Sequence, residues 1–196
     1  MTHFPADDVV ARGRKSVVRR KRISDARDEY NWRTDAELAR FDASRPVQSE
    51  FRSYERNWSF DYRFTDMAGR SFAVEDENGR HIGNIMYYNI DHQRAEAEIG
   101  ISIGERDCWS RGYGSDAIEA LTWKLLRTTG IRRFYLHTLD WNRRAQRAFQ
   151  RAGFQVCGTS WRDGHTFVVM ELLREWVEPP QRTAVVPEAP PALMAG

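Results

Sequence analysis

The run from Trp109 to Ser115 carries the residue types of an anion site. Gly112 and Gly114 have no Cβ, so the backbone there can turn tightly and a ligand can approach it closely. The first amides of a helix that follows such a turn point outward, and with the positive end of the helix dipole they attract a diphosphate. Arg111 adds a charge-assisted donor. A simple strand-to-helix connection would use the same glycines, and both interpretations stand at this point.

The residues on either side have the periodicities of a strand and a helix. Between Glu96 and Gly104, Ala and Ile alternate with Glu, Gly and Ser, which predicts a strand with one buried and one polar face. Between Ala117 and Leu126, apolar residues recur at spacings of three and four, as in a helix packed on a sheet. The nucleotide-binding pattern G-x-x-x-x-G-K-[ST] is absent, and no third glycine completes G-x-G-x-x-G. The sequence therefore favours another phosphate carrier.

Composition limits the classes of protein to which the chain can belong. A chain of 196 residues with 41% hydrophobic content can close one sizeable core. The net charge of +2 argues against nucleic acid as the main partner. Cys108 and Cys157 indicate neither a disulfide framework nor a thiolate zinc site, and the histidines show no ligand spacing, so we expect no metal. Since no span for a bilayer and no secretion signal can be read, we expect a cytoplasmic protein without membrane partners.

Strand and helix signals alternate along the rest of the chain. We expect a strand within 12–22, helices from 24, 34 and 49, strands 71–75, 81–90 and 96–104, a helix to about 128, a strand 131–140, a helix 142–152, and strands 154–161 and 165–173. Turn residues at 76–79 and 91–94 make the middle strands an antiparallel meander. Because a helix separates them, strands 96–104 and 131–140 should lie parallel.

Both ends of the chain differ from its middle. Residues 1–14 are polar with little periodicity and are expected to form a flexible arm, whereas 178–196 are rich in Pro and Ala and are expected to be a disordered tail. The basic run 12–22 is either a nucleic-acid arm or a strand with a charged edge, and Val17, Val18 and Ile23 favour the strand. We therefore expect one folded domain over 15–177.

Two motifs give the chain a resemblance to the GNAT superfamily of acyl-CoA-dependent N-acetyltransferases. WSRGYGSDAIEAL, residues 109–121, is similar to that family's pyrophosphate motif [Q/R]-x-x-G-x-[G/A], with Trp109 in place of Gln or Arg. NRRAQRAFQRAGF, residues 142–154, is similar to a second motif, N-x-x-A-x-x-[FY]-x-x-x-G-F. The Arg-rich opening strand and the tryptophan before the glycines look most like the ribosomal-protein N-terminal acetyltransferase branch.

The resemblance implies a mixed α/β (α+β) fold and a place for a cofactor. The central sheet would be mostly antiparallel, splayed between its fourth and fifth strands, and flanked by about four helices. Acetyl-CoA would lie in the splay as a co-substrate, with its pantetheine on the strand backbone and its pyrophosphate on the turn amides. The implied contacts are Ile101, Ser102, Ile103, Trp109, Ser110, Arg111, Gly112, Tyr113, Gly114, Ser115, Asn142 and Ala145.

The implied reaction moves an acetyl group to a primary amine, either a protein N-terminus or a small molecule, by direct attack on the thioester. Glu98 is the predicted general base, either directly or through a water, because it projects from the polar face of the strand toward the expected cleft. Glu96 is the second choice, and an ordinary solvent-facing carboxylate describes it better. No acceptor is selected, because the charges in residues 41–66 are mixed.

The general acid is a point of departure from the resembled family. Many members carry a tyrosine seven residues after the motif asparagine, where this chain has Phe149. Either the thiolate takes a solvent proton, or Tyr87, Tyr88 or Ser102 donates one. Phe149 also motivates an alternative function, a CoA-binding module with weak or no transferase activity. His137 could reach the cleft, although a hydrogen-bonded core histidine is the commoner case. A homodimer through the last hairpin is a further expectation.

Overall fold

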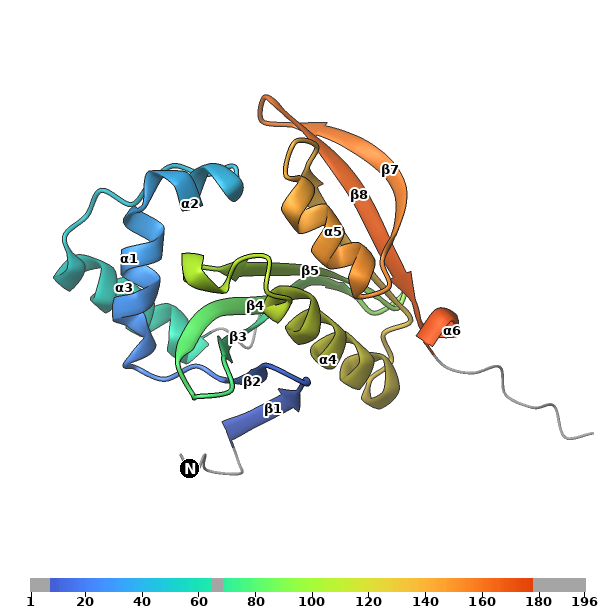
Figure 1. The fold of residues 1–196 in the computed structure, drawn as a ribbon, viewed down its shortest axis with the longest axis horizontal. Helices are drawn as coiled ribbons and strands as arrows, with labels where there is room; N and C mark the ends of the chain where they lie inside the picture. Colours follow the sequence, from blue (N-terminus) through green and yellow to red (C-terminus); the bar gives the residue numbers. More distant parts are fainter. Residues whose placement is uncertain (1–7, 65–68, 178–196) are drawn as a thin grey trace, which may run out of the picture.

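The computed structural model describes residues 8–64 and 69–177, so the expected tail and the first half of the expected arm lie outside the described residues. Within that part, the strands form one sheet in the order β1-β2-β3-β4-β5-β6-β8-β7 (Figure 1). They are β1 (Val9–Arg12), β2 (Val17–Arg20), β3 (Gly69–Glu75), β4 (His81–Asp91), β5 (Glu96–Ile103), β6 (Arg133–Leu139), β7 (Gln155–Arg162) and β8 (His165–Leu173). Only β5 and β6 are parallel; the other neighbours are antiparallel, which confirms the predicted mixed sheet.

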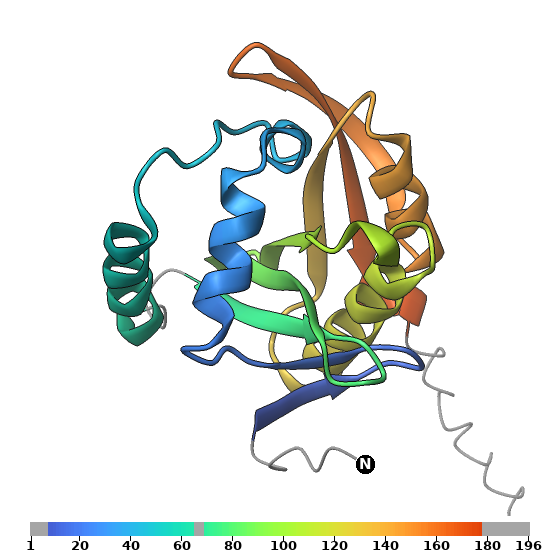
Figure 2. The same cartoon turned by 60° about the vertical axis from the view of Figure 1, so that its left-hand side comes forward.

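The helices lie on both sides of this sheet. They are α1 (Asp25–Thr34), α2 (Ala36–Phe41), α3 (Phe51–Phe64), the 3-10 turn η2 (Arg106–Cys108), α4 (Tyr113–Thr128), α5 (Arg143–Arg151) and the single turn α6 (Arg174–Val177). Helices α4 and α5 lie together on one side, and α1 to α3 gather on the other (Figures 1 and 2). The longer helices are α1, α3, α4 and α5, in keeping with the expected number of about four, and α2 and α6 are shorter pieces. None of the described helices combines the length and apolar character needed to cross a membrane.

Local sequence signals account for some of the element boundaries. Asp35 begins α2, and its side chain accepts hydrogen bonds from the amides of Glu37 and Leu38. The last hairpin turns at Asp163 and Gly164, whose φ angles of +52° and +79° are those of the expected two-residue turn. The helix expected from 34 thus begins at the Asp35 cap, because Thr34 is the last residue of α1. The strands expected at 154–161 and 165–173 form a hairpin, which is confirmed.

The N-terminal region differs from the expectation in one respect. Val9–Arg12, within the stretch expected to be an arm, form β1 and pair with β2. The strand expected in the basic run is confirmed at Val17–Arg20. Arg19 is 2% exposed, lies 2.7 Å from Asp25, and also pairs with Glu75. Because these carboxylates are internal, this arginine is committed to the fold and not to an outside partner.

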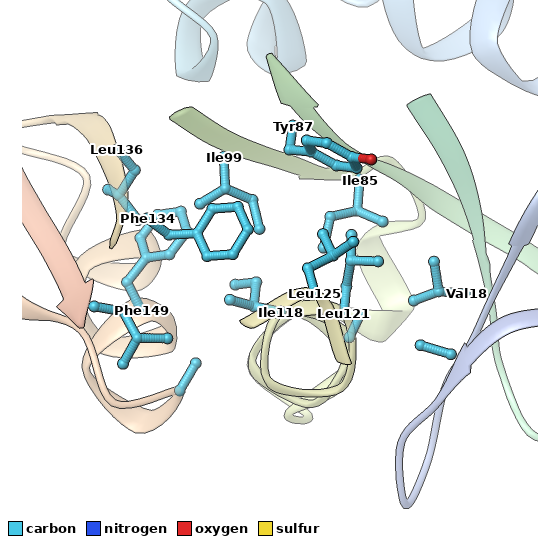
Figure 3. Close-up of a cluster of buried hydrophobic side chains, with 14 of the residues drawn as sticks. Val18, Ile85, Tyr87, Ile99, Ile118, Leu121, Leu125, Phe134, Leu136 and Phe149 are labelled. Atoms are coloured by element: carbon cyan, nitrogen blue, oxygen red, sulfur yellow. The ribbon is translucent and has the colours of Figure 1, made fainter. Parts of the chain in front are cut away.

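The hydrophobic core lies between the sheet and α4 (Figure 3). Ile85 and Ile99 from the sheet meet Ile118 and Leu121 from α4, and all four are 2% exposed or less. This packing holds α4 beneath β5. The loop that joins the two elements is therefore held at the carboxyl end of β5.

Candidate functional site

Strands β5 and β6 separate after a short parallel contact. Their pairing covers only Glu96–Glu98 on β5 and Arg133–Tyr135 on β6. Past this point β5 pairs with β4 on its other side, and β6 pairs with β8. Backbone groups on the inner edge of β5 beyond Glu98 therefore have no strand partner among the described residues, and the predicted splay is confirmed.

A cleft of about 800 Å³ follows the splay, which is within the usual range for small-molecule sites. It is bounded by β4, β5, β6 and α5, and also by α2 and the turn between β7 and β8. The cleft brings together most of the predicted site residues. These are Glu98, Ile101, Ser102, Ile103, Trp109, Ser110, Gly112, Gly114, Ser115, Asn142 and Ala145.

The loop at the open end of the cleft has the geometry of an anion site. Gly112 has a φ of +93°, and Ser110 has a φ of +61°. Helix α4 begins after this loop, and no side chain caps its start. The first backbone amide that donates within this turn is that of Asp116, which lies 3.0 Å from the carbonyl oxygen of Gly112. The amides of residues 113–115 are thus available to a ligand beside the positive end of the helix dipole.

Two predicted contacts in this loop place their side chains outside the cleft. Arg111 is exposed, and its carbonyl accepts from Lys15 Nζ at 3.1 Å. The hydroxyl of Tyr113 donates to Glu77 at 2.8 Å. This bond and burial raise the pKa of Tyr113 to about 12. Only the backbone of these two residues can serve a ligand in the cleft.

Trp109 braces the loop and positions a cation. Its indole Nε1 donates to the carbonyl of Ile103 at 2.7 Å. The guanidinium of Arg144 lies 3.5 Å from the centre of its ring, an arrangement with favourable cation–π energy. Arg144 comes from α5 and lines the cleft. The tryptophan that departs from the family motif therefore brings an arginine to the loop from another element.

Sequence reasoning missed a row of arginines on α5. Arg144, Arg147 and Arg151 line the cleft at spacings of four residues or fewer, so they share one side of the helix. In the part of the chain that the structure describes, no carboxylate pairs with any of them. The available signal was the segment 143–151, which contains four arginines and no acidic residue.

The two candidate carboxylates have different surroundings. Glu96 lies at the paired base of the splay, where Arg133 donates to it at 2.6 Å, and it does not line the cleft. Glu98 lines the cleft but is only 4% exposed. Its Oε1 lies 2.8 Å from His137 Nδ1, and its Oε2 accepts from Asn89 Nδ2 at 2.9 Å. Of these two carboxylates, Glu98 is therefore the one that lines the cleft, and it is already hydrogen-bonded.

The three suggested proton donors are also separated by the fold. Tyr88 and Ser102 line the cleft, whereas Tyr87 is buried in the core. Burial and the adjacent Glu98 carboxylate, to which the hydroxyl hydrogen-bonds, raise the pKa of Tyr88 well above its ordinary value. Tyr88 is thus a protonated but weakly acidic donor.

Helix α5 contributes the residues of the second motif. The side-chain oxygen of Asn142 caps the helix by accepting from the amide of Ala145 at 3.2 Å. Its amide group remains to face the cleft that both residues line. Phe149 also borders the cleft, but its ring packs on Phe154 with centres 6.0 Å apart. Among the residues described, no cluster of His, Cys, Asp and Glu side chains could hold a metal ion.

Comparisons with known proteins agree with this geometry. The acetyltransferase (GNAT) domain family matches residues 16–155. No curated protein matches the sequence. A spermidine N-acetyltransferase from Vibrio cholerae, solved with CoA and spermine, has a TM-score of 0.71 and 20% identity over 83% of this chain and 98% of that chain.

Two further solved structures are similar at lower identity. The aminoglycoside acetyltransferase AAC(6')-Ib, in complex with coenzyme A, has a TM-score of 0.69 and 17% identity over 82% of this chain and 96% of that one. The microcin C7 self-immunity acetyltransferase MccE, with acetyl-CoA and AMP, has a TM-score of 0.66 and 15% identity over 82% and 93%. At these identities the likeness shows the fold.

Proposed function

The chain belongs to the acetyltransferase (GNAT) family, and we propose that it transfers the acetyl group of acetyl-CoA to a primary amine by direct attack on the thioester. The observation that carries this proposal is the opening of β5 from β6 into a cleft that ends at an uncapped helix start. Such a cleft suits an extended molecule with a diphosphate at one end.

The residues present fit acetyl-CoA along the length of the cleft. The amides at the start of α4 suit its pyrophosphate, and Arg144, Arg147 and Arg151 add positive charge beside them. From Ile103 back to Glu98, the strand rises roughly 17 Å at about 3.3 Å per residue. A pantetheine arm laid along this edge brings the thioester toward Glu98. Acetyl-CoA supplies the acetyl group and the thiolate that leaves.

The reacting end contains a carboxylate and a backbone donor. We propose that Glu98 is the general base for the amine proton, which reaches it directly or through an intervening group such as a water. Glu96 is the second choice. A backbone amide near Ile101, on the unpaired edge of β5, would polarise the thioester oxygen. Asn142 would orient the cofactor, and Ala145 would leave room for its arm.

A second cavity offers a route for the acceptor. It has a volume of about 920 Å³ and shares Arg33, Asp42, Met86 and Ser102 with the first. Both charge signs line it, so neither a polycation nor an acidic substrate is selected. We propose that the acceptor is a protein N-terminus, as in the ribosomal-protein branch, or a small-molecule amine.

We also propose a cytoplasmic location and a homodimer that forms through the edge strand β7. Analytical sedimentation would test the homodimer.

Binding and turnover can be measured separately. We expect acetyl-CoA to release heat in titration calorimetry and thiol to appear when a suitable amine is added from a panel of polyamines, aminoglycosides and peptides. Glu98→Gln should retain binding and lose turnover by about 10² to 10⁴-fold. Glu96→Gln tests the second choice, and because that carboxylate lies outside the cleft, its turnover should stay near wild type. A larger loss of turnover in Glu96→Gln than in Glu98→Gln would assign the base to Glu96. Absence of heat with every acyl-CoA would end the proposal.

A CoA-binding module is the second candidate, and Phe149 at the position of the usual acid is the observation that favours it. A module would bind acetyl-CoA, acetylate no amine of the panel, and be unaffected by Glu98→Gln. Turnover with any amine, lost in Glu98→Gln, excludes it.

A further inference from the structure

We propose that the imidazole of His137 takes the proton from the acceptor amine, and that Glu98 is the positioning residue that holds this imidazole. The inference rests on the transferase function proposed above and assigns the intervening group at the reacting end. It requires His137 to be placed where the acceptor and the thioester meet, and to have a free basic nitrogen.

His137 lies where the two strands separate. Tyr135 on β6 is the last residue paired with β5, opposite Glu98, and His137 is the next residue of β6 on the same face. The contact between His137 Nδ1 and Glu98 Oε1, at 2.8 Å, spans the two strands at the apex of the splay. Both residues line the cleft. The pair therefore stands at the end of the cleft remote from the Gly112 loop, where the thioester is placed.

Glu98 is poorly placed to receive a proton from substrate by itself. Its side chain is 5% exposed, against 18% for that of His137. The carboxylate already accepts from Asn89 and His137 and is hydrogen-bonded by Tyr88. An amine would have to displace one of these donors to reach it. The more exposed imidazole offers a route that leaves the buried carboxylate fully partnered.

The carboxylate also determines which ring nitrogen is basic. A carboxylate accepts hydrogen bonds, so the neutral imidazole carries its proton on Nδ1 and leaves Nε2 as the acceptor. Nε2 has no hydrogen-bond partner within the described residues. The ring of His137 is held between Tyr135 and Phe167, whose centres lie 6.0 Å and 6.3 Å away. Its orientation is therefore restricted by two aromatic neighbours and one hydrogen-bond partner.

Several titratable or charged groups contact this imidazole or line the same cleft. Glu98 from β5 and Tyr135 from its own strand β6 contact it. Tyr88 from β4, Arg162 from β7 and Asp163 from the turn after β7 line the cleft with it. The two tyrosines are neutral, since burial and nearby carboxylates raise the pKa of each. Glu98 is the negative partner in direct contact with the ring.

The proton transfers balance in the proposed step. An acceptor ammonium gives one proton to Nε2, and the freed lone pair forms the C–N bond with the acetyl carbon. The C–S bond breaks, and its electron pair leaves on sulfur. The second nitrogen proton ends on that sulfur by way of solvent, and the imidazolium returns its proton to solvent. The amine is acetylated and CoA leaves as the thiol.

Variants at the two positions separate the roles. His137→Gln keeps a donor for Glu98 but offers no basic nitrogen, so kcat should fall about 10² to 10⁴-fold while KM for both substrates stays unchanged. Glu98→Gln should lower kcat less than His137→Gln if its role is positioning. His165→Gln is the matched control, because His165 is exposed near the tip of the neighbouring hairpin and does not line the cleft.

The pH dependence gives a second readout. Wild-type kcat/KM should fall on the acid side as Nε2 is protonated, and His137→Gln should lose this limb. In Glu98→Gln the limb should remain, because the basic nitrogen of His137 is still present. If Glu98 were the base, Glu98→Gln would abolish the limb and His137→Gln would retain it, which would overturn the proposal.

Imidazole NMR tests the pair without turnover. The free protein should show His137 with its proton on Nδ1, and this tautomer preference should weaken in Glu98→Gln. Each variant should still bind acetyl-CoA, which would show that its fold is intact. The double variant, with both His137→Gln and Glu98→Gln, controls for any effect of a buried Glu98 carboxylate that has lost its histidine partner. A wild-type protein that binds no acyl-CoA refutes the transferase, whereas wild-type turnover in His137→Gln refutes only the role of His137.

Discussion

At the scale of single residues, the proposed phosphate site depends on one backbone conformation. Gly112 has a φ of +93°, and a Cβ added there would meet no atom within 4 Å. A side chain at this position is therefore opposed by backbone strain and not by lack of space. It would also stand over the amides that the proposed diphosphate must approach.

Gly112→Ala should lower the free energy of unfolding by about 1 to 2 kcal/mol and weaken acetyl-CoA binding. Urea unfolding and calorimetry measure the two effects. Gly164→Ala is the control, because Gly164 has a φ of +79° with equally open space but lies outside the cleft. Gly164→Ala should lower the free energy of unfolding by a similar amount and leave the affinity for acetyl-CoA unchanged. A parallel loss of affinity in both variants would contradict a specific role for Gly112.

At the scale of elements, one carboxylate ties the first hairpin to the helix that begins at the cleft. Asp116 on α4 accepts from the amides of Arg14, Lys15 and Ser16, each at 2.9 Å. It also accepts from the hydroxyl of Ser16 at 2.7 Å. Burial alone would raise the pKa of Asp116, but these hydrogen bonds outweigh it and lower the pKa below its ordinary value.

Asp116→Asn should lower the free energy of unfolding at pH 7 by about 2 kcal/mol, because charged acceptors make the stronger hydrogen bonds. Since the pKa is lowered in the folded state, this contribution is present above the unfolded pKa of about 3.9 and is lost as pH falls through the folded value. Urea unfolding from pH 7 to pH 3 should show wild type and variant converging.

The matched control for this element is Glu119→Gln on the same helix. Glu119 forms an ion pair with the exposed Arg14 at 3.5 Å, and such pairs contribute roughly 0.2 to 1 kcal/mol. Glu119→Gln should lower the free energy of unfolding clearly less than Asp116→Asn does. A difference between wild type and Asp116→Asn that stays constant down to pH 3 would rule out the charged form as the source.

At the scale of the whole molecule, the sheet has two arms joined by a short seam. Strands β1 to β5 form one arm, and β6, β8 and β7 form the other (Figure 1). The strand contact between them is the three-residue pairing of β5 with β6. A ligand that lies in the splay touches both arms, so it should stabilise the molecule as a unit.

Acetyl-CoA at 100 times its Kd should add about 2.7 kcal/mol to the free energy of unfolding. For a chain of this size, that raises Tm by roughly 5 to 10 °C. Hydrogen exchange should slow on both arms, at Ile101 of β5 and at His137 of β6. The control is 3'-phospho-ADP, which lacks the pantetheine arm and should protect only the loop at Gly112. Protection confined to one arm by acetyl-CoA would contradict binding in the splay.

The sequence by itself determined features that depend on short-range interactions. The alternation in residues 96–103 predicted a strand with a polar face, and a helix between two strands predicted their parallel arrangement. The turn at Gly112 was readable because it involves backbone groups only a few residues away. Much of the cleft could therefore be predicted from these local patterns and the two motifs.

Tertiary structure alone decided the contacts between residues distant in the chain. The pair of Glu98 and His137 joins positions 39 residues apart, and it exists because β5 and β6 pair in one particular register. Arg144 reaches Trp109 only because α5 packs beside the loop. Spacing along the chain carries no record of register or of helix placement, which are set by how the buried faces fit together. For that reason the sequence identified Glu98, but only the folded chain showed that its carboxylate is occupied and that an imidazole is presented to the cleft.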